Sequence, residues 1–177
     1  MLGLPFTVCP ADIDETPQAG LTPKQVAEDL AVKKASVVAR SLPPPASRYI
    51  LAADTVVVPG GQILGKPENR DEAGRMLRLL ADRKHEVITA MALLDLQNKK
   101  TDCRSVSCEV LFAPLSDAEI EWYLDTGEWE GAAGAYRLQS LGGCLIKKIN
   151  GSPSAVAGLP LHEFYVMLRD NGYQFGA

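Results

Sequence analysis

An α/β fold with a mixed central sheet and flanking helices is predicted by the order of apolar patterns along this chain of 177 residues. Segments with helical spacing are interspersed with segments rich in β-branched residues, which is typical of α/β proteins. Two of the strand-like segments flank a short polar turn, as the strands of a hairpin do. The hairpin favours a mixed sheet over a purely parallel one.

The first helix is expected at Pro23–Arg40. Thr22 can cap this helix, and Gln25 can reach back to complete a capping box. The three prolines at 43–45 then form a surface connection. The following segment, Tyr49–Val58, is apolar on both faces and therefore predicts a central strand that is covered on both sides.

The next elements are marked by caps and turns. Asn69, with Glu72 three residues later, opens a second helix, whose apolar stripe comprises Ala73, Met76, Leu77 and Leu80. The segments 85–96 and 105–115 flank the turn "QNKK" and predict a long hairpin.

The last third of the chain has the same signals. Ser116 caps a third helix that Gly127 ends, and the Gly-rich segment 127–140 leads to a strand at 144–149. A final helix is expected at 161–171, closed by Gly172.

The composition excludes several function classes. A hydrophobic content of 46% and a charged content of 23% are those of a globular protein, with room for one domain or two small lobes around a cleft. The formal net charge of −4 argues against a nucleic-acid polymer or an anionic membrane as partner.

The cysteines and the apolar runs predict a cytoplasmic protein. Cys9, Cys103, Cys108 and Cys144 lack the paired spacing of a zinc or redox site. No apolar run approaches the roughly 20 residues of a membrane span, and the first residues lack the pattern of a signal peptide.

The segment "PGGQILGKP" has the glycine and lysine spacing of a phosphate-binding loop. Pro67 stands where that loop needs a Ser or Thr hydroxyl, so a Walker-type site is excluded. Gly60 or Gly61 supplies the positive φ of a tight turn between two strands. Lys66, at the end of the second strand, is either a phosphate contact or an ordinary surface lysine.

Asp54 lies within an apolar strand, where an ionised carboxylate needs a cation, a metal or several donors. It is either a functional acid or a structural one. Asp12, Asp14 and Glu15 follow a strand-like segment at 5–9 and form either half of a Mg²⁺ site or a solvated turn.

Lys34 continues the apolar series of the first helix. Its stem either snorkels outward or brings a cation to the site. Two acidic positions for a divalent cation and two lysines for phosphate oxygens together fit phosphoanhydride chemistry. His85 and His162 show no pattern of a catalytic triad or a zinc site.

The chain resembles the Maf-like nucleoside triphosphate pyrophosphatases over nearly its whole length. The resemblance is carried by motifs in the order and spacing of that family: "DIDE", "LAVKKA", "AADTVVV", "ILGKP", "AGRMLRLLADRKHEV", "DTGEWEGAAGAYRLQ" and "AVAGLPLHEF".

The resemblance implies a fold like that of the inosine triphosphatase group. It also implies hydrolysis of dTTP or UTP, and of modified pyrimidine nucleotides, to the monophosphate and pyrophosphate with Mg²⁺ or Mn²⁺, and a possible homodimer. Asp54 then corresponds to the proton acceptor and, with Glu15, to the metal ligands. Substrate contacts are implied at Thr55, Gln139, Lys34 and Lys66, with Thr55 and Gln139 as specificity positions.

The chain departs from the family pattern at several points. It begins after the place of the usual Ser-x-Ser-Pro-Arg-Arg segment, so a single Maf-like domain that is truncated at its N-terminus is expected over residues 1–177. Ala132 replaces a usual lysine, Ala90 replaces a glycine, and Arg137 stands where glycine is frequent.

Two other classes of function stay open on the sequence. Because phosphate-binding arginines are missing, a weakened nucleotide-binding regulator of septum formation is the main alternative to the enzyme. A purely structural α/β domain is the third interpretation, but it does not explain why charged residues fall on apolar stripes.

Overall fold

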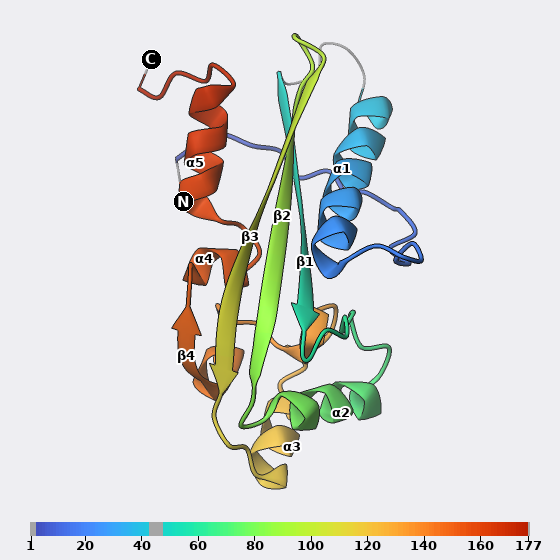
Figure 1. The fold of residues 1–177 in the computed structure, drawn as a ribbon, viewed down its shortest axis with the longest axis vertical. Helices are drawn as coiled ribbons and strands as arrows, with labels where there is room; N and C mark the ends of the chain where they lie inside the picture. Colours follow the sequence, from blue (N-terminus) through green and yellow to red (C-terminus); the bar gives the residue numbers. More distant parts are fainter. Residues whose placement is uncertain (1–2, 43–47, 177) are drawn as a thin grey trace. The chain divides into compact units, whose positions relative to one another are not determined.

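A computed structural model of the chain describes residues 3–42 and 48–176 (Figure 1). The expected connection at 43–45 lies outside these residues. The helices are α1 Pro23–Ser41, α2 Arg70–Leu80, α3 Asp117–Asp125, α4 Pro153–Val156 and α5 Leu161–Asp170. The strands are β1 Tyr49–Val58, β2 Lys84–Asp95, β3 Lys100–Phe112 and β4 Ile146–Asn150. Two short 3₁₀ turns are η1 Ala133–Ala135 and η2 Leu141–Leu145. None of the helices that the structure describes combines the length and the apolar character needed to cross a membrane.

The strands form one sheet in the order β1-β2-β3-β4. β3 and β4 pair antiparallel, with Val110 opposite Ile149 and a bulge between Leu111 and Phe112. β2 and β3 are joined by the turn at 96–99, which is too short for a parallel crossover. The predicted α/β architecture of a sheet with flanking helices is therefore confirmed, and its described strands run antiparallel.

The interpretation of β1 as a central strand is wrong for this sheet. β1 lies at one end of the strand order, and β2 is the strand that has a neighbour on each side. In β2, Ala90 to Leu93 are at most 1% exposed. The apolar character of β1 has another cause, because helix α1 and the loop residue Leu64, which bridges to Val57, cover it in place of a second strand.

A buried acid closes the hairpin between β2 and β3. The Oδ1 atom of Asp95 accepts hydrogen bonds from the backbone N–H groups of Gln97 and Asn98, at 3.0 and 3.1 Å. Arg48 donates to Oδ2 at 2.9 Å, and this guanidinium holds the pKa of Asp95 down at about 2. Asp95 therefore has a structural role. A structural role of this kind was one of the two interpretations of Asp54 from the sequence.

The chain divides into two compact units, which are described separately. Unit 1 consists of residues 1–54, 90–105 and 161–177, and unit 2 of residues 55–89 and 106–160. Because β1, β2 and β3 each cross the division, every unit contains a part of these strands.

In unit 1, helices cover opposite faces of the strands. Ser105 of β3 donates to Glu28 of α1 at 2.7 Å, whereas Asp102 of β3 accepts from Asn171, which follows α5, at 2.8 Å. Residues 102 and 105 point to opposite faces, since side chains alternate along a strand. Consequently α1 and α5 do not share a face of unit 1 (Figure 1).

The capping box predicted for α1 is confirmed. Thr22 accepts from the Gln25 N–H group, and the Gln25 side chain accepts from the Thr22 N–H group. The strand expected at 5–9 is wrong: this segment is irregular, and Phe6 and Val8 are 84% and 77% exposed. Alternating apolar residues make a strand only when a neighbouring strand satisfies the backbone.

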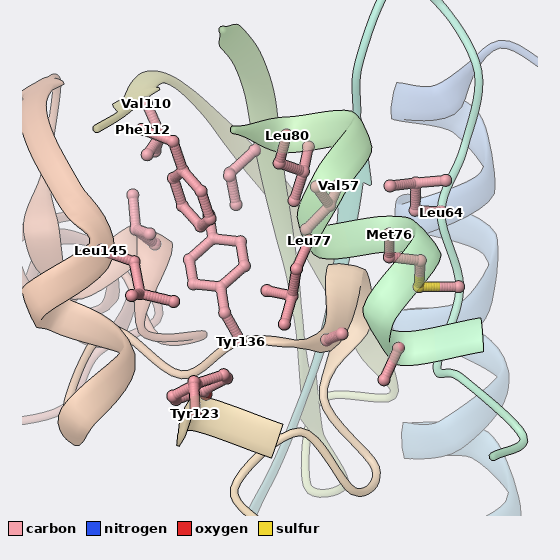
Figure 2. Packing of buried hydrophobic residues seen from close by; sticks show 14 of the residues in the cluster. Val57, Leu64, Met76, Leu77, Leu80, Val110, Phe112, Tyr123, Tyr136 and Leu145 are labelled. Atoms are coloured by element: carbon pink, nitrogen blue, oxygen red, sulfur yellow. The ribbon is translucent and has the colours of Figure 1, made fainter. Parts of the chain in front are cut away.

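In unit 2, one apolar cluster joins α2, α3, β3 and the loop that follows α3 (Figure 2). Leu77 and Leu80 of α2 and Tyr123 of α3 are fully buried in it. The predicted stripe of α2 is confirmed, as are its Asn69 cap and the Ser116 capping box of α3. Aromatic rings form the part of the cluster next to β3.

His85 lies in this aromatic part and is 3% exposed. Its ring packs edge to face against Phe112 and Tyr136, with centroids 5.2 and 5.6 Å apart. The Nε2 atom is 2.9 Å from the Tyr136 hydroxyl. Burial lowers the pKa of His85 from 6.5 to about 4. The His85 ring is therefore neutral in the folded protein at neutral pH.

This burial predicts acid sensitivity. Because the folded pKa is about 4 and the unfolded pKa is 6.5, the unfolded chain binds the proton more tightly, and stability is lost as the pH falls from 6.5 towards 4. Between pH 7 and pH 5 we expect His85 to account for a loss of about 2 kcal/mol in the free energy of unfolding. Urea unfolding of the wild-type protein and of His85→Gln at pH 7 and pH 5 measures this loss. An equal change of the free energy of unfolding in both proteins would contradict the expectation.

Candidate active site

Asp54 lies on the face of β1 that turns towards α1. It shares this face with Ile50 and Val56, which are also buried, and it is itself only 8% exposed. An ionised carboxylate in such surroundings requires a compensating charge. The structure places that charge on α1.

The charge belongs to Lys34, whose Nζ atom is 2.6 Å from Asp54 Oδ1. The same Nζ atom is 2.8 Å from Glu15 Oε1. Lys34 is on the buried stripe of α1 with Leu30 and Val38, and its side chain is only 17% exposed. The alternative of a lysine that snorkels outward is therefore wrong.

Electrostatics keeps this lysine charged. Burial alone would lower the pKa of Lys34, but the hydrogen bonds to Asp54 and Glu15 outweigh burial and the pKa is raised. The group carries one ammonium and two carboxylates, which leaves one net negative charge. We refer to Glu15, Lys34 and Asp54 as the acidic triad.

The three acids of the segment 12–15 have different environments. Glu15 joins the triad with 35% of its side chain exposed. Asp14 accepts from the Thr16 N–H group at 2.8 Å, and hydrogen bonding to Thr16 lowers its pKa. Asp12 is exposed. The segment is thus partly a capped turn and partly, through Glu15, an ion-pair partner of Lys34.

Two carboxylates of the acidic triad are the candidate ligands for a small divalent cation. Within the part of the chain that the structure describes, no three acidic, histidine or cysteine side chains gather as a metal cluster. However, Mg²⁺ in phosphate-processing sites is commonly held by only one or two carboxylates, together with water and substrate oxygens. Glu15 and Asp54 supply two hard oxygen donors of this kind.

In unit 2, Thr55 follows Asp54 directly in β1 and therefore points to the opposite face. Its hydroxyl is 2.8 Å from the hydroxyl of Thr89 in β2. Thr89 donates to the backbone oxygen of Ala155 in α4 at 2.7 Å. This connection links the predicted specificity position to the motif "AVAGLP".

Lys66 is exposed, and the backbone beside it is fixed within unit 2. The Gly134 N–H group donates to Gly65 O at 3.0 Å, and the Leu64 N–H group donates to Val57 O at 2.8 Å. The predicted turn is confirmed, because Gly60 and Gly61 both have positive φ, but the second strand expected after it is wrong: Leu64 forms only an isolated bridge to Val57. The motifs "ILGKP" and "AGAY" are therefore held together by their backbones.

Gly134 has no room for a side chain. Its φ is +67°, and an added Cβ would lie 2.9 Å from Val57 Cγ1. We expect Gly134→Ala to lower the free energy of unfolding by about 2–4 kcal/mol, through backbone strain and overpacking. Gly60→Ala is the matched control, because Gly60 has a φ of +58° and open space around it. Equal losses in urea unfolding would contradict the packing argument.

Gln139 is exposed and lies on a loop of unit 2. Side chains of this loop form hydrogen bonds with the loop's own backbone. Arg137 donates to the backbone oxygens of Glu128 and Glu130, at 2.9 and 2.6 Å. The Glu128 carboxylate in turn accepts from the N–H groups of Leu141 and Gly142. The unusual arginine therefore holds the loop that carries Gln139.

Arginines also gather on α2, a helix that carries none of the predicted site residues. Arg70, Gly74 and Arg78 line a polar hollow together with residues of α3. Arg70 is paired with Glu121 at 2.8 Å, and Arg78 with Asp117 at 2.9 Å. Since both guanidinium groups are already paired with carboxylates, this hollow is a surface ion-pair network, and none of the predicted site residues lines it.

The structure thus brings Glu15, Lys34 and Asp54 together in unit 1. Thr55, Lys66 and Gln139 belong to unit 2, where each is fixed by different neighbours. Sequence reasoning missed the part that Thr89 plays beside Thr55. A buried threonine in an apolar strand was the available signal, because its hydroxyl needs a partner.

Comparison with known proteins agrees with this set of motifs. A family model described as Maf-like protein matches residues 1–171. The chain belongs to the Maf-like family. Its membership accounts for the Maf-like order of the acidic triad, the "ILGKP" segment and the "AGAYRLQ" loop along the chain.

Curated relatives match this Maf-like chain over nearly its whole length. A protein of Pelotomaculum thermopropionicum is 42% identical over 172 residues, which cover 97% of this chain and 88% of that protein. A protein of Halalkalibacterium halodurans is 44% identical with the same shares, and one of Caulobacter vibrioides is 43% identical over 96% of this chain and 86% of that protein. Each of these relatives is named dTTP/UTP pyrophosphatase.

Proposed function

We propose that this chain hydrolyses nucleoside triphosphates, preferably dTTP and UTP, to the monophosphate and pyrophosphate. The names of the Maf-like relatives support the reaction and the substrates. The observation that carries the proposal is the acidic triad, in which one ammonium group, on a side chain that is 17% exposed, holds two carboxylates within 2.8 Å. On this proposal the chain is a hydrolase that acts in nucleotide metabolism.

Asp54 is the proposed proton acceptor. A water molecule attacks the α-phosphorus, the bond from that phosphorus to the pyrophosphate oxygen breaks, and the water proton passes to the Asp54 carboxylate. Because Asp54 is 8% exposed and fixed by Lys34, its carboxylate needs little reorganisation before it accepts the proton. Pyrophosphate leaves with the electron pair of the broken bond.

The charge of the triphosphate is the second requirement. Lys34 and Lys66 are the proposed phosphate contacts, as the resemblance to the family implies. A divalent cation, Mg²⁺ or Mn²⁺, held by Glu15 and Asp54 would neutralise the charge that develops on the phosphate oxygens. Lys34 pairs with one oxygen of each carboxylate and so holds the two side chains on one ammonium group.

Base selection is proposed for Thr55 and Gln139. A glutamine side chain both donates and accepts, so it can pair with the edge of a pyrimidine. The Gln139 loop is kept in shape by Arg137 and Glu128, and Thr55 is fixed by Thr89. A site that hydrogen-bonds a base penalises bases that leave its groups unpaired.

Pyrophosphate release tests the proposal. We expect turnover of dTTP and UTP with Mg²⁺ or Mn²⁺, much slower turnover of GTP, and loss of activity when the metal is chelated. Nucleotide binding without turnover would contradict the enzyme and support the septum-formation regulator, which the comparisons do not favour. A cytoplasmic location and a homodimer remain predictions from the sequence and the resemblance.

A further inference from the structure

Four groups of unit 2 form one continuous hydrogen-bond chain. The Thr55 and Thr89 hydroxyls are 2.8 Å apart, and Thr89 Oγ1 is 2.7 Å from Ala155 O. The Gly158 N–H group donates to the same Ala155 oxygen at 2.9 Å. Thr89 and Ala155 are at most 1% exposed, so water does not compete for this chain.

The direction of the chain follows from its buried end. A carbonyl oxygen cannot donate, so the proton of the Thr89 hydroxyl points to Ala155. A hydroxyl has one proton, and Thr89 can therefore only accept from Thr55. The proton of Thr55 must point inward to Thr89. The Thr55 hydroxyl can therefore only accept a hydrogen bond from a ligand.

The surroundings keep this hydroxyl accessible. Thr55 is half-buried, whereas Thr89 is fully buried. Gly158 lies beside the Thr55 hydroxyl with a φ of +102°, and a Cβ added there would come within 3.7 Å of Thr55 Oγ1. A glycine at this position therefore leaves the space next to the hydroxyl unfilled by a side chain.

We infer that Thr89 is a positioning residue that leaves Thr55 only an acceptor towards a ligand, and that this polarity selects, among the pyrimidine bases, those that carry a proton on N3. Uracil and thymine carry a proton on N3, whereas N3 of cytosine is an acceptor. An acceptor-only Thr55 pairs with the first two and opposes a lone pair in the third. The inference rests on the proposed function, since it concerns the base of the same substrate.

Thr89→Val tests the inference by removing the inner hydroxyl while keeping the branched shape. Without its acceptor, the Thr55 hydroxyl is free to rotate and to donate to cytosine. We expect the ratio of kcat/KM for UTP to that for CTP to fall about tenfold. Thr89→Ser keeps the hydroxyl and should keep the ratio. If Thr89→Val does not fold, Thr89→Ala removes the same hydroxyl.

The ratio separates positioning from mere stability. A purely structural Thr89 would lower the melting temperature, or slow UTP and CTP equally, and leave the ratio unchanged; this result would overturn the inference alone. Thr55→Val should also lower the ratio, and adding Thr89→Val to it should change the ratio no further. A wild-type protein that turns over neither nucleotide would overturn the proposed function and the inference with it.

Discussion

Asp54→Asn is expected to lower kcat for dTTP and UTP by about 10²–10⁴-fold, because an amide cannot accept the proton of the attacking water. The fold should survive. The amide has the shape of the carboxylate, and Lys34 keeps Glu15 as an ionic partner at 2.8 Å, so no bare charge is left. Steady-state kinetics and a thermal unfolding curve on the same sample measure both results.

Asp71→Asn provides the control for this variant. Asp71 is an exposed acid in the first turn of α2 and takes no part in the proposed chemistry. It should retain the full rate. An Asp54→Asn protein that is as fast as the wild type would remove Asp54 as proton acceptor, and one that is unfolded would show that its charge is needed for structure.

Lys34→Met is expected to affect both stability and activity. It leaves the Asp54 and Glu15 carboxylates without their shared cation, and Asp54 is 8% exposed. We expect a loss of about 1–3 kcal/mol in the free energy of unfolding. We also expect kcat/KM to fall by more than about tenfold, since a charge-assisted phosphate contact is lost.

The adjacent lysine gives a matched control on the same helix. Lys33 pairs with Asp29 at 2.6 Å, with about a third of both side chains exposed. Such i,i+4 surface pairs contribute about 0.3–0.5 kcal/mol, so Lys33→Met should change stability little and activity not at all. Equal effects of the two substitutions in urea unfolding and in kinetics would contradict the special role of Lys34.

Much of the fold was predictable because local chemistry decides it. The Thr22 and Ser116 capping boxes satisfy backbone groups within a few residues, so their sequence pattern marks the helix start directly. The ends at Gly127 and Gly172 follow from the positive φ that glycine adopts easily. These features depend on no distant part of the chain.

The errors arose where the outcome depends on distant partners. The position of a strand in the sheet is decided by which strands pair with it, and the apolar run of β1 does not contain that information. Similarly, the residues 5–9 alternate like a strand although Phe6 and Val8 are exposed. A period of two is necessary for a half-buried strand but does not provide a neighbour.

The candidate site was predictable in part. Asp54 stood out because an acid in an apolar strand must be compensated, and its partner Lys34 lies 20 residues away on a stripe where a lysine is unexpected. The motif alone could not show whether the Lys34 stem turns inward. The structural roles of Thr89 and Arg137 were not predictable, since they exist only through contacts with β1, α4 and the backbone of residues 128 and 130.

The reciprocal contacts of Arg137 and Glu128 couple the two residues energetically. Arg137 binds the backbone of residue 128, and the side chain of residue 128 binds the backbone beyond Gln139. Loss of either side chain removes the hydrogen bonds that one part of this loop makes to the other. Because the two side chains act on one loop, the loss of stability on replacing both is expected to differ from the sum of the two single losses.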